Sequence, residues 1–396
     1  MSSRSRAADP QPGLPELAEL SLAELRTRRS AKWRLNPPDV LPAFVAEMDF
    51  PLAAPIREAL LAAVERGDTG YPAPASLGAA FAAFAAARFA WQVDPGRVRP
   101  VSDVVSAIAE LLRALTEPGD EVVVNPPIYP PFFGTVAEVG RRIVEVPLVH
   151  SAGGYALDLE GLERSFVRGA RAYLLCHPHN PSGCSFRREE LAAVAALAAR
   201  YGVIVVSDEI HAPLTLAGAT HVPYLSLGAE AAAHGVAIAG ASKAWNIAGL
   251  KCALIVSDSE TIDARLTARL PGHLPYHVGH LGVIASIAAF EQGGPWLDAV
   301  LVKLERNRAE LGALLAASLP GVGYEPPEAG YLAWLDCREL GLGEDPAAVF
   351  LERGRVALSP GPSFGRQGYG FARLNFATSP ALLAEAVARM ASAATA

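Results

Sequence analysis

The chain has 396 residues, of which 51% are hydrophobic and 19% are charged. This length favours two domains, or one large α/β domain with an appendage, and the composition excludes a disordered protein. The net charge is −7, because 41 acidic residues outnumber 34 basic ones, and the basic residues form no block. The charge therefore argues against a protein that binds a phosphate backbone, and no nucleic-acid partner is expected.

Neither a targeting signal nor a membrane segment is visible in the sequence. The first 15 residues are rich in proline and predict a mobile tail, with no apolar stretch that would make a secretory signal. The longest apolar run, 77–87, is too short to cross a bilayer. The four cysteines (Cys176, Cys184, Cys252 and Cys337) show no CxxC spacing, so neither a disulfide framework nor a zinc site is expected. Together these features predict a cytoplasmic protein with no membrane partner.

The predicted elements alternate between helices and strands through the middle of the chain. Residues 17–28 predict a short helix, and the proline-rich stretch 36–49 predicts an extended arm. Apolar residues at helical spacing predict helices, and short β-branched runs predict strands; the helices are 56–66, 77–89, 104–115 and 187–200, and the strands are 121–124, 143–146, 172–175, 203–206, 236–239 and 253–256. Apolar strands separated by helices predict an α/β fold, with a mostly parallel sheet covered on both faces.

The pattern changes near residue 281. Two long helices, 281–292 and 296–318, precede short strands, a loop rich in glycine and proline, and a last helix at 380–391. We therefore expect three parts: an N-terminal tail and arm (1–45) that packs with the small domain, a large ligand-binding domain (46–281) and a small C-terminal α+β domain (282–396).

Polar side chains follow four of the predicted strands where each strand ends. Tyr129, Asn180, Asp208 and the pair Ser242–Lys243 all lie just beyond apolar runs. The carboxyl ends of parallel strands meet at one edge of a sheet, which is where open α/β sheets bind ligands. A lysine in apolar surroundings attacks an aldehyde readily, a carboxylate can hold a cationic ring nitrogen, and a helix N-terminus binds phosphate. This set fits pyridoxal 5′-phosphate (PLP).

Eight segments in the same order carry a resemblance to a known family. They are RRSAKW, VAEMDF, DTGYP, PPIYPPFF, HNPSG, SDEIHA, ASKAWNIAGLK and ARLNFA. The chain resembles, from about residue 28 to residue 390, the class I/II aminotransferases of the fold-type I PLP-dependent superfamily, and within them the MalY/PatB-type cystathionine β-lyases.

The resemblance implies a catalytic role for several residues. Lys243 would form the Schiff base with the cofactor and later move the Cα proton. Asp208 would pair with the pyridine nitrogen, Asn180 would bond the phenolic oxygen, and Tyr129 would stack on the ring. Arg373 would bind the substrate carboxylate as a bidentate pair.

The resemblance also implies a phosphate site shared between two subunits. Ser242 and the backbone of Val104 and Val105 would hold the phosphate, and Tyr71 would reach the phosphate of the neighbouring subunit. A homodimer with shared active sites is therefore expected.

Three positions depart from the pattern of many aminotransferases. Lys251 stands where an arginine often binds the phosphate, and it lacks the fork geometry of a guanidinium. Many aminotransferases have a tyrosine three residues after the ring-pairing aspartate. This chain has His211 there, as the lyase-like branch does. After Arg373 the chain continues NFATSP instead of NxACPR, which leaves substrate selection open.

The spacing of His273, His277 and His280 raises the possibility of a metal site. Pro275 interrupts the helix that would present them, and no acidic residue lies close in sequence. No metal is expected.

Three functions stay open at this point. The first is a PLP-dependent lyase that splits cystathionine or related cysteine S-conjugates into pyruvate, ammonia and a thiol. The second is a PLP-dependent aminotransferase acting on an amino acid and a 2-oxo acid, which would use the same residues. The third is a partner-binding regulator on the same scaffold, against which the intact lysine argues.

Overall fold

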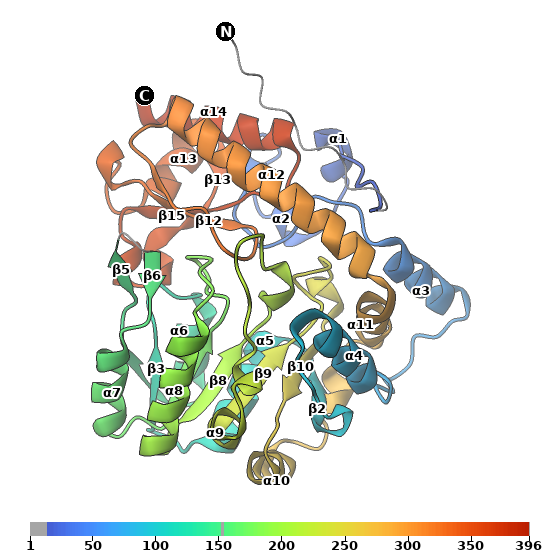
Figure 1. Cartoon of the computed structure of the whole chain (residues 1–396). Helices are drawn as coiled ribbons and strands as arrows, with labels where there is room; N and C mark the ends of the chain where they lie inside the picture. The colour runs from blue at the N-terminus through green and yellow to red at the C-terminus, as the bar shows by residue number, and fades with distance from the viewer. Residues whose placement is uncertain (1–13, 152–153, 396) are drawn as a thin grey trace.

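The computed structural model describes residues 14–151 and 154–395, so the predicted tail lies almost wholly outside the described residues. A seven-stranded sheet forms the centre, in the order β2-β10-β9-β8-β7-β3-β4 (Figure 1). Neighbouring strands are parallel from β9 to β4, and β10 is antiparallel to both β9 and β2. The strands are β2 (Val98–Val101), β3 (Glu121–Val124), β4 (Arg142–Glu145), β7 (Ala172–Cys176), β8 (Ile204–Asp208), β9 (Gly235–Ala239) and β10 (Ala253–Val256). The predicted α/β fold with a mostly parallel sheet is confirmed.

Helices cover both faces of this sheet. Successive strand residues point to opposite faces, so Ile204 and Val206 of β8 belong to one buried cluster and Val205 belongs to the other. The first face is covered by α5 (Val104–Leu115), α6 (Pro131–Glu138) and α10 (Glu260–Arg269). The second face packs against α4 (Leu77–Phe89), α7 (Leu159–Val167), α8 (Arg188–Tyr201), α9 (Ala229–His234) and α11 (His280–Gln292). Both faces are thus removed from water, as the apolar strands require.

A smaller sheet lies above the large one in Figure 1. It has four strands in the order β11-β12-β15-β14, each antiparallel to its neighbour. Its elements are β11 (Gly323–Tyr324), β12 (Leu332–Asp336), β14 (Ser359–Pro360), β15 (Phe371–Asn375) and the helices α12 (Gly294–Ser318), α13 (Pro346–Gly354) and α14 (Pro380–Thr395). A hairpin of β5 (Val149–Ser151) and β6 (Gly154–Ala156) stands beside it.

The N-terminal segment crosses over to the C-terminal part of the chain, where it forms a separate two-stranded sheet. It contains α1 (Leu22–Leu25), α2 (Ala31–Arg34) and β1 (Leu41–Pro42), and β1 pairs in parallel with β13 (Val356–Ala357). The helix predicted at 17–28 is shorter than expected, because α1 has only four residues and is capped by Ser21. Beyond it, Arg28 donates to the carbonyl oxygens of Met48 and Phe50. The division of the chain at residues 45 and 281 stays a prediction.

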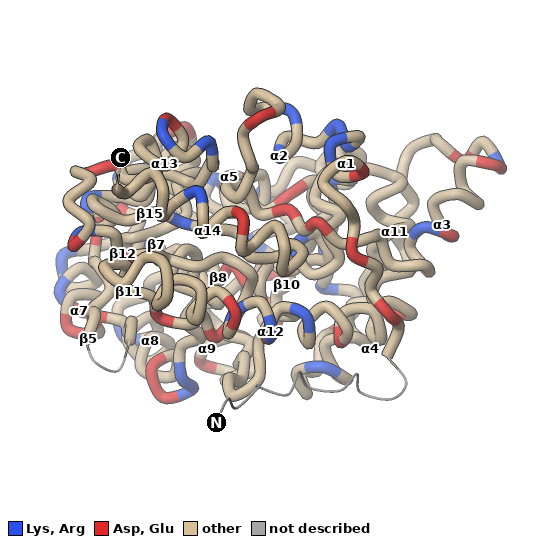
Figure 2. The backbone as a smooth tube through the Cα atoms, turned by 90° about the horizontal axis from the view of Figure 1, so that it is seen from above, with Lys and Arg blue, Asp and Glu red and all other residues tan. Residues whose placement is uncertain are grey.

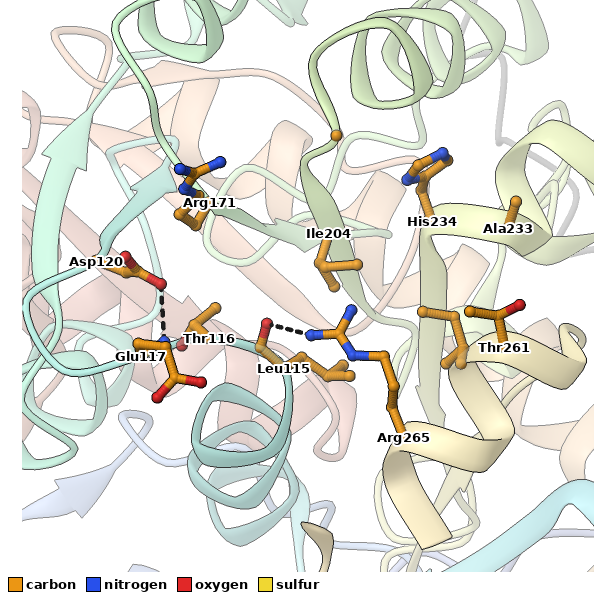
Figure 3. Close-up of a pocket in the computed structure, with 12 residues that line it drawn as sticks. Leu115, Thr116, Glu117, Asp120, Arg171, Ile204, Ala233, His234, Thr261 and Arg265 are labelled. Carbon is orange, nitrogen blue, oxygen red and sulfur yellow. Dashed lines mark hydrogen bonds between the residues drawn. The ribbon is translucent and has the colours of Figure 1, made fainter. Parts of the chain in front are cut away.

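Helix α5 runs across the sheet from the carboxyl ends of the strands to their amino ends. Three arginines donate to carbonyl groups at its C-terminal end: Arg141 to Leu112 and Thr116, Arg265 to Leu115 and Arg269 to Ala114. Figure 3 shows Arg265 reaching Leu115 across a hollow of about 340 Å³. Cations at a helix C-terminus satisfy the last carbonyl groups and offset the negative end of the helix dipole. The guanidinium of Arg265 in this hollow thus has a structural role.

Charged residues of both signs are interspersed around the outline of the molecule (Figure 2). Within the described part of the chain, no helix is both long enough and apolar enough to cross a membrane.

We predict that Arg141→Met lowers the free energy of unfolding by about 2–4 kcal/mol, because several carbonyl oxygens lose a buried charged donor. Arg141 is 8% exposed and also bonds the hydroxyl of Thr116 at 2.9 Å. Arg142→Met is the matched control, because the neighbouring side chain is 70% exposed. Denaturant unfolding of both variants checks the prediction. Equal stability of the two variants would contradict it.

Candidate active site

A cavity of about 490 Å³ opens at the carboxyl ends of the central strands. Seventeen residues line it, and they include ten of the eleven predicted site residues: Val104, Val105, Tyr129, Asn180, Asp208, His211, Ser242, Lys243, Lys251 and Arg373. These ten come from segments up to 269 positions apart (373 − 104), and the sheet edge brings them together.

Lys243 lies in the turn that follows β9. Its Nζ donates to the carbonyl oxygen of Ala46 at 3.4 Å, and no described carboxylate lies within ion-pair distance of it. Burial and the nearby positive charge of Arg373 lower the pKa of Lys243 to about 8, although Glu47 and Asp208 oppose this shift. A substantial fraction of this amine is therefore neutral near physiological pH, as a nucleophile or a base requires.

Asp208 is the last residue of β8 and is 4% exposed. One carboxylate oxygen accepts the backbone N–H of Ile210 at 3.2 Å. Burial raises the pKa of Asp208 to about 7, while Lys243 acts in the opposite direction. A buried carboxylate with so few donors gains from a cationic ligand nitrogen placed against it.

Asn180 and Arg373 form one unit. The Oδ1 atom of Asn180 accepts a hydrogen bond from Nη1 of Arg373 at 2.9 Å, which orients the amide so that its Nδ2 donor points away from the guanidinium. Nη2 of Arg373 donates to the Phe44 carbonyl and the Ser359 hydroxyl, both at 3.0 Å. Its Nε is buried and has no partner among the described residues. This unsatisfied donor is available to an anionic ligand group.

The N-terminus of α5 forms the anion-binding end of the cavity. The side chain of Asp103 caps the helix by accepting the N–H of Ser106 at 2.8 Å. The N–H groups of Val104 and Val105 are the first two of the helix and have no acceptor within it. Lys251 forms an ion pair with Asp103 at 3.0 Å. Backbone donors and the helix dipole favour a phosphate here.

Tyr129 and His211 complete the walls. The ring of Tyr129 packs edge-on against Phe132, and burial raises the pKa of its hydroxyl group, which therefore stays protonated. Burial together with Lys243 and Arg373 lowers the pKa of His211 to about 3, so its imidazole is neutral. The Nδ1 atom of His211 is buried without a partner in the described chain.

Sequence reasoning missed that the segment 44–49 forms part of the cavity. Val45 and Ala46 line it, and the side chain of Asn246 bonds both the N–H and the carbonyl of Met48 at 2.8 and 2.9 Å. Asn375 donates to the carbonyl groups of Val45 and Glu47 from the other side. The motif VAEMDF marked this segment, but nothing local in it indicates a place in the cavity.

Tyr71 does not line the cavity. It is 84% exposed, and its ring meets Tyr276 edge-on at 6.3 Å. Its predicted role requires a second chain and stays a prediction.

The three histidines considered for a metal do not converge. His280 contacts Asp68 at 3.0 Å, while the rings of His273 and His277 lie 4.9 Å apart. Among the residues that the structure describes, no group of three or more potential ligands is placed to hold a metal ion.

Comparison with known proteins agrees with this geometry. The model of the family "Aminotransferase class I and II" matches residues 46–390. The chain belongs to this family. A Mycobacterium leprae protein provisionally named cystathionine β-lyase is 46% identical, over 94% of this chain and 97% of its own length. The cystathionine β-lyase PatB of Bacillus subtilis is 39% identical, over 90% and 92%.

A solved structure shows the same fold as this family member. The provisionally named PLP-dependent β-cystathionase of Corynebacterium diphtheriae superposes with a TM-score of 0.91 and 36% identity, over 96% of this chain and 100% of its own. The chain thus has the fold of a fold-type I PLP-dependent enzyme, and PLP is the cofactor of this family.

The residues present fit PLP. The cavity offers an amine for its aldehyde at Lys243, a carboxylate for its ring nitrogen at Asp208, an amide donor at Asn180 and helix N–H groups for its phosphate. The partnerless Nδ1 of His211 and Nε of Arg373 are buried polar atoms that a polar ligand in the cavity could satisfy.

We predict that the amine of Lys243 in the apoprotein reacts with PLP faster as the pH rises, because only the neutral amine attacks an aldehyde. The curve of rate against pH should have its midpoint near pH 8. Borohydride trapping at each pH, followed by peptide mapping, measures the adduct on Lys243. Lys243→Ala is the control for reaction at other lysines. A midpoint near 10.5, the ordinary value for lysine, would refute the effect of burial.

Proposed function

We propose that the protein is a PLP-dependent carbon–sulfur β-lyase that cleaves cystathionine or related cysteine S-conjugates by α,β-elimination. The observation that carries the proposal is one cavity in which the weakly basic amine of Lys243 lies with Asp208, Asn180 and Arg373. The names of the 46% and 39% identical relatives support a lyase over an aminotransferase.

Bound PLP supplies the aldehyde that takes up the substrate amine and the ring that accepts the electrons left at Cα. Lys243 takes the proton from Cα through its neutral Nζ. Asp208 holds a proton on the ring nitrogen, so the ring stays electron-poor. Overall, the Cα–H and Cβ–S bonds break, the sulfur leaves with a proton as a thiol, and one water converts the remainder to pyruvate and ammonia.

The other cavity residues bind and orient in this proposal. Arg373 pairs with the substrate carboxylate, and its bond to Asn180 fixes that carboxylate relative to the amide that bonds the phenolic oxygen. Tyr129 and the neutral His211 both line the cavity and would contact the cofactor ring, with Tyr129 stacking on it. The N–H groups of Val104 and Val105 bind the phosphate together with Ser242, whose hydroxyl also donates to the Cys252 carbonyl. Lys251, paired with Asp103, adds positive charge at this end.

We also propose a homodimer in which Tyr71 reaches the partner's phosphate. Tyr71 (84% exposed) and its ring neighbour Tyr276 (62%) are both large exposed apolar side chains, and Leu61 (54%) and Val64 (56%) are two more. Leu61 and Val64 belong to α3 (Ala54–Glu65), which projects at one side of the molecule in Figure 1. Large apolar groups exposed to water, such as the Tyr71–Tyr276 pair, are consistent with a surface that a second subunit covers.

A cytoplasmic location is part of the proposal. All four cysteines are free thiols: Cys176, Cys252 and Cys337 are buried, and Cys184 is partly buried. Free thiols in this number suit a reducing compartment.

We expect the purified, PLP-loaded enzyme to release pyruvate and homocysteine from L-cystathionine without an added 2-oxo acid. Lys243→Ala should lower the rate by at least about 10³-fold, because the base at Cα is lost. Coupled assays for pyruvate and for free thiol measure both products. If alanine or an aromatic amino acid reacts faster, and only with a 2-oxo acid present, the enzyme is an aminotransferase.

The shared site predicts complementation between two impaired variants. A mixed dimer of Tyr71→Ala and Lys243→Ala chains has one site with both defects and one intact site. Refolding the two together should restore about a quarter of wild-type activity, because about half of the dimers are mixed and each has one good site of two. Refolded wild type is the control, and Tyr71→Ala must be impaired alone. Activity at the mean of the two homodimers would show that Tyr71 does not serve a partner's site.

A further inference from the structure

A second buried carboxylate, that of Glu209, belongs to the residue that follows Asp208 in the chain, and it has no part in the chemistry above. It is 3% exposed. Its N–H donates to Ile238 of β9, so the backbone continues the β8 ladder. Consecutive residues of a strand point to opposite faces. Asp208 therefore shares the α5 side with Val206, and Glu209 shares the opposite side with Val205.

Three donors converge on the Glu209 carboxylate. Its Oε1 accepts the Ser207 hydroxyl at 3.0 Å and the backbone N–H of Tyr224 at 2.9 Å. Its Oε2 lies 3.0 Å from Nε2 of His221. Burial raises the pKa of Glu209 to about 7, and the hydrogen bonds from Tyr224 and Ser207 oppose this shift. Three donors are the set that an ionised carboxylate needs, whereas a protonated acid would need an acceptor, so the geometry favours the charged form.

The two histidines nearby do not cancel this charge. Nε2 of His177 donates to the Val222 carbonyl, and its Nδ1 accepts the N–H of Phe186, so His177 holds a single proton. Its ring stacks on His221 at 4.6 Å, and burial lowers the pKa of both histidines to about 3. Nδ1 of His221 is buried without a partner in the described chain, which disfavours a second N–H there.

We propose that Glu209 is a positioning residue that acts through Asp208: its buried negative charge raises the proton affinity of the Asp208 carboxylate and of the cationic nitrogen held against it. This inference rests on the proposed function, because that nitrogen belongs to PLP. A like charge close to a carboxylate disfavours its ionised form. Glu209 accordingly adds to the effect of burial on the pKa of Asp208.

Other ionisable groups act on the same pair of carboxylates and stay unchanged in the tests below. Those around Asp208 are Lys243, Arg373, Tyr129, His211 and Cys176, and those around Glu209 are His177, His221 and Tyr224. A shift on changing Glu209 alone is therefore attributable to its charge.

The test is a pH titration of the visible absorption band of PLP-loaded Glu209→Gln. Removing the negative charge lowers the proton affinity of the cofactor nitrogen. The pH at the midpoint of the absorption titration should therefore fall by on the order of one unit. kcat should fall, while KM for the substrate changes little. Glu163→Gln is the matched control: it makes the same charge change at a residue that bonds Tyr201 and Arg200, and its midpoint should equal that of wild type.

Two variants of His221 keep the test decisive if Glu209→Gln does not fold. His221→Gln retains an N–H donor toward Glu209 and should keep the wild-type midpoint. His221→Phe removes the donor, favours protonated Glu209 and should lower the midpoint. Thermal unfolding, measured in parallel, reports any purely structural effect, which would not move the midpoint.

A wild-type midpoint in folded Glu209→Gln, or in His221→Phe where Glu209→Gln does not fold, would overturn this inference and leave the proposed function intact. Wild-type protein that forms no visible band with PLP would instead overturn the proposed function, and the inference with it.

Discussion

The burial of incompletely paired charges at the carboxyl ends of the strands is the constraint on which the cavity depends. Lys243 has one long hydrogen bond to Ala46, and Asp208 has one to Ile210. Burial moves both groups toward their neutral forms, with the pKa of the amine lowered to about 8 and that of the carboxyl raised to about 7. A ligand that carries a cationic nitrogen and an anionic end would complete the charge balance that the protein alone leaves unfinished.

Helix α5 links this constraint to the opposite edge of the sheet. Its N-terminal N–H groups face the cavity, and its last carbonyl groups are bonded by Arg141, Arg265 and Arg269. A helix dipole acts at both ends, equivalent to about half a charge at each. The arginines offset the negative end, and at the positive end Asp103 caps only the N–H of Ser106, which leaves those of Val104 and Val105 for an anion. The hollow of Figure 3 and the active-site cavity therefore lie at the two ends of one helix.

Much of the site could be predicted because its residues directly follow apolar strands. Asp208 ends the buried strand β8, and Asn180 and Lys243 lie shortly after β7 and β9; parallel strands bring such positions to one edge. The helix at 104–115 matches α5 because its apolar spacing is regular. Strand β2 was not predicted: it is four residues long and includes Pro100, which an edge strand tolerates.

Other features depend on contacts that no local pattern contains. The segment 44–49 is held in the cavity by Asn246 and Asn375, which lie about 200 and 330 residues further along the chain. The helix predicted at 17–28 is only α1, and Arg28 beyond it donates to carbonyl groups some 20 positions away, a contact that no local pattern indicates. The proposed role of Tyr71 depends on contacts with a second subunit, which a single chain does not contain.

The free cysteines have a consequence for an enzyme that releases thiols. Burial raises the pKa of all four, to about 11 for Cys252 and about 12 for Cys184 and Cys337, so thiolate is scarce on this protein. Thiol–disulfide exchange needs a thiolate to attack. A released thiol that becomes oxidised to a disulfide would find no reactive sulfur among these residues, so mixed disulfides would form slowly. The enzyme would thus resist modification by the oxidised form of its own product.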